Sequence, residues 1–193
     1  ARRADSRPFP EQRTDTARDW LRRPPGGRPG GFAYANVGYI MVGAAIERIT
    51  RQPWEDAVKT HVFDPLGMKD VGFGPPRGDS PQGHSGGMFG GVSARPDIDN
   101  PAALAPAGTV HLRLSEWAKF LAVFIDPAQT FLSADSLARL VTPAAGQDYA
   151  LGWGVGDHPR YGRMFQHAGS NTAWLAQAML LPDHQAAVMT VCN

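Results

Sequence analysis

The rest of this chain can be placed around the segment Phe32-Ala-Tyr-Ala-Asn-Val-Gly-Tyr-Ile-Met-Val-Gly43. The cluster Pro29-Gly30-Gly31 precedes it and predicts a turn. Residues 39–49 are apolar at nearly every position, which predicts a helix that is buried on most sides. Tyr34 and Asn36 then lie at the mouth of this helix, where a phenol and a carboxamide can point into a cleft. Because Tyr-x-Asn is frequent in ordinary turns, a tyrosine that only caps the helix is the alternative.

A series of short motifs extends this pattern along the chain. After residues 32–50 come, in order, Val62-Phe-Asp-Pro-Leu-Gly-Met68, Pro106-Ala-Gly108, Leu151-Gly-Trp153 and His167-Ala-Gly-Ser-Asn171. The series resembles the class C β-lactamase and penicillin-binding serine hydrolase family, which includes D-Ala-D-Ala carboxypeptidases and esterases. The resemblance covers most of the chain from about Trp20 onward. It implies an α+β fold of the β-lactamase/transpeptidase type, with an antiparallel β-sheet flanked by helices beside a mostly helical region.

Length and charge limit the classes of partner. The 193 residues suffice for one large domain or two small ones. A net charge of +1 gives no reason to expect nucleic acid or an anionic membrane as a partner. No stretch is long and apolar enough to span a membrane. No signal peptide is present, but the chain begins without an initiator methionine, so the compartment stays open. The resemblance implies a periplasmic or other extracytoplasmic location.

The first 31 residues differ in composition from the rest of the chain. They hold five of the 17 prolines and eight of the 16 arginines, with four interspersed acids and few aliphatic residues. Such a segment has too little apolar surface to build a core of its own. We therefore expect 1–31 to be a poorly structured arm or the remnant of a preceding region, with at most a short helix over 16–21. Residues 32–193 are expected to form a partial serine hydrolase domain.

The first helices are predicted from apolar spacing and from helix start signals. One helix is expected over 37–51, and Pro53 begins another in which His61 is partly buried. A loop rich in glycine and proline follows over 72–106. Loops of this length in compact proteins are often functional. His84 within it is usually solvated in such a context, and the alternative is a contact with substrate.

Two later helices are predicted from capping residues. Ser115 is expected to be the N-cap of one helix, with Leu114 as a hydrophobic staple. Ser133 is expected to cap a shorter helix that stops at Pro143.

The last part of the chain changes to strand patterns. Strands are expected over 149–155, 161–167, 173–181 and 185–192, with a hairpin between the last two. Those two are nearly continuous apolar runs, which favours a sheet covered on both faces. Cys192 falls in the last run, and we expect it to be a small core residue.

The chemistry that the resemblance implies is acyl transfer through a serine ester. It requires a nucleophile, a base that deprotonates it and an oxyanion hole. In the family the serine and a lysine come as Ser-x-x-Lys on a helix upstream of the tyrosine motif. No serine stands three residues before any of the chain's three lysines, so the nucleophile is missing here. Our first hypothesis is that a longer parent chain supplies it, that the domain is incomplete at both ends, and that these residues alone are inactive. The alternative is a non-catalytic relative that only binds peptidoglycan-like or peptide ligands.

The resemblance assigns roles to five residues of this chain. Tyr34 matches the tyrosine that takes part in proton transfer, and Asn36 the residue that hydrogen-bonds the substrate amide or orients the lysine. His167 stands where other members carry the lysine of Lys-Thr-Gly, so it holds a substrate carboxylate less firmly. Gly169 lets a substrate backbone approach the strand edge. The amide of Ser170 is one oxyanion donor. For His167-x-Gly taken alone, a strand-end histidine before a turn is the alternative.

Other chemistry has little support in the sequence. The six histidines show no metal-binding spacing, and no glycine-rich phosphate loop follows a strand, so we expect no metal and no cofactor. The expected partner is a small-molecule or peptidyl substrate. An ester, a D-Ala peptide and a β-lactam share the same acyl chemistry, so the sequence leaves all three open.

Overall fold

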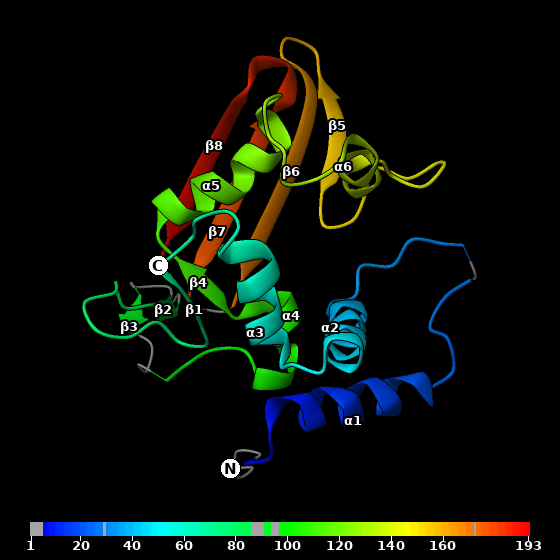
Figure 1. Cartoon of the computed structure of the whole chain (residues 1–193), viewed down its shortest axis with the longest axis vertical. Helices are drawn as coiled ribbons and strands as arrows, with labels where there is room; N and C mark the ends of the chain where they lie inside the picture. The colour runs from blue at the N-terminus through cyan, green and yellow to red at the C-terminus, as the bar shows by residue number, and fades with distance from the viewer. Residues whose placement is uncertain (1–5, 29, 86–90, 94–96, 172) are drawn as a thin grey trace.

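A computed structural model describes residues 6–28, 30–85, 91–93, 97–171 and 173–193 of the chain. Figure 1 shows a group of helices at the end of the molecule that carries the N-terminus, and a four-stranded antiparallel sheet at the other end. The helices at the first end are α1 (Phe9–Leu21), α2 (Asn36–Thr50), α3 (Trp54–Val58) and α4 (Ala105–Gly108). This is the predicted α+β architecture.

Helix α2 is the centre of the helical group. It packs against α1 on one side and α4 on another. The approach to α4 is close, because a Cβ added at Gly43 would lie 2.4 Å from the Pro106 side chain. Helix α2 ends at Thr50, and its C-cap Arg51 has φ of 60°. Helix α3 continues directly into a π-helical turn over Lys59–Phe63. A 3-10 turn over Ala102–Leu104 precedes α4.

Helix α1 corrects the expectation of a poorly structured arm over 1–31. Its charged residues include Arg13, which is fully buried. The Arg13 guanidinium donates to Glu47 of α2 at 2.5 Å and to Glu55 of α3 at 2.7 Å. Burial lowers the pKa of Arg13, but the hydrogen bonds to these two carboxylates outweigh it and raise the pKa overall. The ion pairs therefore attach a segment of low apolar content to the helical group.

The main sheet follows the order of the chain. Its strands are β5 (Gly154–His158), β6 (Gly162–Ser170), β7 (Leu175–Leu181) and β8 (Ala186–Cys192), all antiparallel. A 3-10 turn over Pro182–His184 joins β7 to β8, with Gln185 at φ of 49°. Helix α5 (Leu114–Ile125) lies across one face of the sheet, and α6 (Ala134–Val141) lies beside β5 (Figure 1). The core between α5 and the sheet is built from buried residues, namely Leu121, Val123, Phe124, Trp153, Phe165, Ala178 and Leu180.

Two small antiparallel pairs complete the described strands. Strand β1 (Val71–Phe73) pairs with β4 (Val110–Leu112), and β2 (His84–Ser85) pairs with β3 (Val92–Ser93). The first pair is attached to the helical group, because Phe73 packs against Trp54 of α3 with ring centroids 5.6 Å apart. In the described part of the chain, no helix is long and apolar enough to cross a membrane.

Helix α6 confirms its predicted cap, because the Ser133 hydroxyl accepts a hydrogen bond from the Ser136 amide at 3.2 Å. The cap predicted for α5 is wrong. That helix begins at Leu114, so Arg113 is the N-cap and Ser115 lies inside the first turn.

The strand predicted from Tyr149 is also wrong at its start, because β5 begins only at Gly154. Residues 149–153 form a tight turn, in which the Ala150 amide donates to the Trp153 carbonyl and Gly152 has φ of 92°. A conformation of that sign is one that glycine adopts readily and that ends a regular strand.

Three burial expectations are corrected by the structure. Within the described residues only one face of the sheet is covered. On the other face, Val188 of β8 and Leu175 of β7 are 58% and 41% exposed. Cys192, at the end of β8, is exposed rather than buried. His61 is exposed on the π-helical turn, and the buried residue of that turn is Phe63 instead.

Candidate active site

Tyr34 lies in the extended segment that leads into α2. Ala35, the N-cap of that helix, has φ of −149° and ψ of 109°, so the chain is extended up to the first helical residue. The Tyr34 side chain is 58% exposed. Its ring stands edge-on to the ring of Tyr149, with centroids 5.8 Å apart and an interplanar angle of 86°. Edge-to-face packing of this kind fixes the direction of a phenol while its oxygen stays accessible.

Tyr149 connects Tyr34 to the sheet. Its hydroxyl oxygen lies 3.0 Å from Nδ1 of His167 on β6. Phe32 packs on the same ring at a centroid distance of 5.2 Å. Burial, followed by the proximity of the Tyr34 and Tyr39 phenols, raises the pKa of Tyr149 to about 12. The Tyr149 hydroxyl is therefore protonated throughout the neutral and mildly alkaline range.

The end of β6 forms a partly open strand edge. Strand β5 pairs with β6 only as far as Gln166, which lies opposite Gly154, whereas β7 pairs with β6 out to Ser170. Residues 167–170 therefore have a strand on one side only within the described part of the sheet. In an antiparallel strand, alternate residues direct their amide and carbonyl groups to opposite sides. A Cβ added at Gly169 would meet no atom within 4 Å, so the face of the strand is open above this residue.

Beyond Ser170, Asn171 fixes the end of the strand. The Asn171 side chain donates to the Asp99 carboxylate at 2.8 Å and accepts from the Trp174 amide at 3.3 Å. The first of these bonds joins the end of β6 to the loop that precedes α4. His84 lies near the same end of the sheet, because its amide donates to the carbonyl of Ala173 at 3.0 Å. Contact of His84 with a substrate stays a prediction.

The structure thus brings Tyr34 and His167 into contact with one tyrosine, Tyr149. Gly169 and Ser170 follow His167 on the same strand. Asn36 is the first residue of α2 and is exposed, and within the described residues its side chain makes no hydrogen bond. Sequence reasoning missed Tyr149 as a site residue. The sequence signal for Tyr149 was its position two residues before the motif Leu151-Gly-Trp153. In the structure, this motif forms a turn at Gly152.

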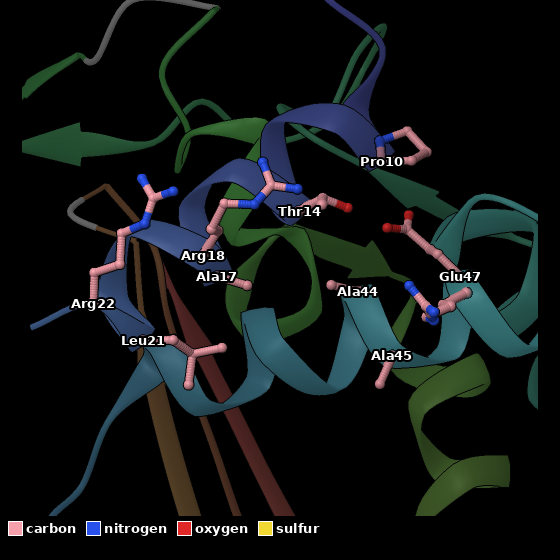
Figure 2. Close-up of a pocket in the computed structure, with 10 residues that line it drawn as sticks. Pro10, Thr14, Ala17, Arg18, Leu21, Arg22, Ala44, Ala45 and Glu47 are labelled. Carbon is pink, nitrogen blue, oxygen red and sulfur yellow. The ribbon is translucent and has the colours of Figure 1, made fainter.

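A separate hollow of about 610 Å³ lies between α1 and α2, as Figure 2 shows. It is open to solvent, and none of the five predicted site residues lines it. Its lining residues are Pro10, Thr14, Ala17, Arg18, Leu21, Arg22, Ala44, Ala45, Glu47 and Arg48. We do not place the chemistry there, because the one hydroxyl in this set, that of Thr14, makes no hydrogen bond to Glu47, whose described partners are Arg13 and Trp54. In the described ranges, no group of three His, Cys, Asp or Glu side chains is arranged to hold a metal ion.

Comparison with known proteins decides the family. The family model described as Beta-lactamase matches residues 2–193. The chain belongs to this family. Among curated proteins, the putative penicillin-binding protein PbpX of Bacillus subtilis (strain 168) is 27% identical over 140 residues, which cover 71% of this chain and 35% of that protein. The chain spans less than half the length of the curated relatives that it matches, 35% of PbpX and 40% of penicillin-binding protein 4* from the same organism.

Solved structures of this β-lactamase-family fold agree with the arrangement seen here. The octameric penicillin-binding protein homologue from Pyrococcus abyssi superposes with a TM-score of 0.74 at 22% identity, over 95% of this chain and 43% of that one. The D-amino acid amidase from Ochrobactrum anthropi SV3, solved with D-phenylalanine, gives a TM-score of 0.67 at 21% identity, over 89% and 54% of the two chains. At these identities the likeness shows the fold.

Proposed function

We propose that this chain supplies part of the active site of an acyl-serine hydrolase, which cleaves an ester, a D-Ala peptide or a β-lactam. The observation that carries the proposal is that Tyr34 and His167 both contact Tyr149, next to the open edge of β6. The two residues come from segments more than 130 positions apart and from different halves of the fold. Membership of the β-lactamase family supports the same chemistry.

In the proposed reaction, a serine hydroxyl from outside residues 1–193 attacks the substrate carbonyl. Its oxygen forms an ester with the acyl group, the bond to the leaving group breaks, and water later hydrolyses the ester. Tyr34 relays the proton from the serine to the leaving group, which is why an exposed phenol oxygen is required. A free phenol has a pKa of about 10, so the relay also needs a cation nearby, and the missing lysine is the expected source.

The other predicted residues bind the substrate. A substrate backbone would lie along residues 167–170 as an added strand, because this stretch of β6 has a described strand on one side only. The Ser170 amide would donate to the oxyanion, and His167 to a carbonyl or carboxylate group. Asn36, exposed at the start of α2, would reach the substrate amide.

The test is covalent labelling of the intact protein that contains this chain. We would incubate it with a fluorescent penicillin and, separately, with a fluorophosphonate, and map any adduct by peptide mass spectrometry. We expect an adduct on a serine outside residues 1–193, which is lost when that serine is changed to alanine. The alternative, a non-catalytic ligand-binding protein, would show saturable binding of a D-Ala peptide but no adduct with either probe.

We also propose an extracytoplasmic location, since D-Ala peptides and β-lactams are encountered outside the cytoplasm. Fractionation of cells that express the intact protein tests this directly, and recovery from the cytoplasmic fraction alone would refute it.

A further inference from the structure

Tyr149 is held in one orientation by its neighbours. Phe32 packs on its ring at 5.2 Å and Tyr34 stands edge-on to it at 5.8 Å. Its backbone is fixed as well, because residue 149 bridges to Gly154 at the start of β5. The ring therefore has little freedom to turn its hydroxyl away from His167, whose Nδ1 lies 3.0 Å from the oxygen.

The chemistry of the pair determines which atom donates. A phenol is a much stronger acid than a neutral imidazole N–H, and an unprotonated ring nitrogen is a better acceptor than a phenol oxygen. The favoured arrangement therefore has the Tyr149 O–H donating to Nδ1. A neutral imidazole carries a single proton, so a ring that accepts at Nδ1 carries that proton on Nε2. The high pKa of Tyr149 keeps this donor in place well above neutral pH.

The opposite nitrogen is available for a ligand. In the described part of the chain, Nε2 of His167 has no protein hydrogen-bond partner, and the residue is only half-buried. It also begins the open stretch of β6 at residues 167–170. An N–H at Nε2 can donate to a carbonyl or carboxylate oxygen, whereas a bare nitrogen at the same place would repel it.

We propose that Tyr149 is a positioning residue for substrate binding, which holds His167 in the tautomer protonated on Nε2 and so makes His167 a hydrogen-bond donor to an acceptor oxygen of the substrate. The inference rests on the proposed function, because it names how one residue of that site is prepared for its ligand. It does not require Tyr149 to touch the substrate. Its own hydroxyl is occupied by His167, and its ring packs against that of Tyr34.

The test is ¹⁵N NMR of the histidine rings in the intact protein, at a pH above the range in which histidine titrates. The signals of His167 are assigned by their loss in His167→Gln. We expect the wild-type ring to show a proton on Nε2 and none on Nδ1. In Tyr149→Phe the two nitrogen shifts should move toward the values of a mixture of tautomers. Tyr161→Phe is the matched control, since Tyr161 stacks on His158 at 4.7 Å, outside the site, and its loss should leave the His167 shifts unchanged.

A proton found on Nδ1 in the wild-type protein overturns the inference without any variant, and so do unchanged shifts in Tyr149→Phe. A kinetic readout on a chromogenic ester adds the functional part. Loss of one hydrogen-bonded orientation should raise KM about 10-fold while kcat falls less. A fall of about 10-fold in kcat in Tyr149→Phe, with KM unchanged, would refute the binding role. Failure of the proposed function is distinguishable, because an inactive protein that forms no adduct still reports its His167 tautomer by NMR.

Discussion

Replacement of Arg13 by methionine should detach α1 from the helical group. Methionine keeps most of the aliphatic length of arginine but removes the guanidinium. In the structure that group donates to Glu47, to Glu55 and to the carbonyl of Ala102 at 3.3 Å. Both the guanidinium and the Glu47 carboxylate are shielded from solvent, with side-chain exposures of 0% and 6%.

The magnitude follows from what the substitution leaves behind. Glu47 would still accept from the Trp54 amide at 2.9 Å through Oε1. Its other oxygen, Oε2, already has no partner among the described residues, so a buried carboxylate would lose its only counter-charge on α1. Removal of one partner from a buried ion pair costs about 3–5 kcal/mol. Because 1.4 kcal/mol is about a factor of 10, opening of α1 should become at least about 100-fold more frequent.

The assay is amide hydrogen exchange of the α1 peptide in the intact protein, followed by mass spectrometry. The matched control is Arg18→Met on the same helix, whose ion pair with Asp15 is 55% and 42% exposed and should contribute under about 1 kcal/mol. The double variant Arg13→Met/Glu47→Gln should recover part of the loss, because the more deeply buried of the two carboxylates left without Arg13, that of Glu47, is then neutral. If Arg13→Met exchanged no faster than Arg18→Met, the ion pairs would not be what holds α1.

Three further outcomes are expected. The 193-residue chain made alone should hydrolyse neither esters nor β-lactams above background, since loss of the nucleophile in comparable sites costs roughly 10⁶-fold; a stable acyl adduct on this chain would contradict that. The chain alone should associate with itself through the open sheet face, and Val188→Lys should shift it toward monomer in sedimentation velocity; a monodisperse wild-type monomer with a sharp melting transition would refute it. In the intact protein, His167→Ala should raise KM more than it lowers kcat, and a fall in kcat alone would show that His167 acts in the chemical step instead.

Elements fixed by local signals were predictable from the sequence. The apolar run after Asn36 predicts α2. Ser133 predicts the start of α6, because its hydroxyl caps that helix. The hairpin between β7 and β8 follows from Pro182-Asp183-His184 between two apolar runs. In each case the residues that decide the structure are neighbours in the chain.

Features that depend on distant partners were not predictable. Arg13 looks like one more solvated charge in an arginine-rich segment, and its acceptors lie 34 and 42 positions away. Cys192 sits in an apolar run that predicts burial, yet its side chain is exposed. A run of apolar residues indicates that a strand is suited to burial, but it does not show whether another part of the chain packs over it.

The sequence predicted individual residues of the candidate site but not Tyr149, the residue that connects them. Tyr34 and His167 were predicted as site residues from the motifs, and the structure places both in contact with Tyr149. Tyr149 itself was assigned to a strand, because the alternation around it resembles one. The positive φ at Gly152, which turns the chain and brings the phenol to His167, has no unambiguous sign in the sequence.

The central claim is that the phenol of Tyr34 moves a proton at an acylated serine, and the rate of acylation tests it most directly. The measurement is the pre-steady-state burst of a chromogenic ester with the intact protein, compared between wild type and Tyr34→Phe, with circular dichroism to confirm that the fold is unchanged. A positioned acid or base is worth about 10²- to 10⁴-fold, so the account predicts a fall of that size in Tyr34→Phe and none in Tyr161→Phe. Acylation of Tyr34→Phe at the wild-type rate would contradict it and leave Tyr34 with a purely structural role.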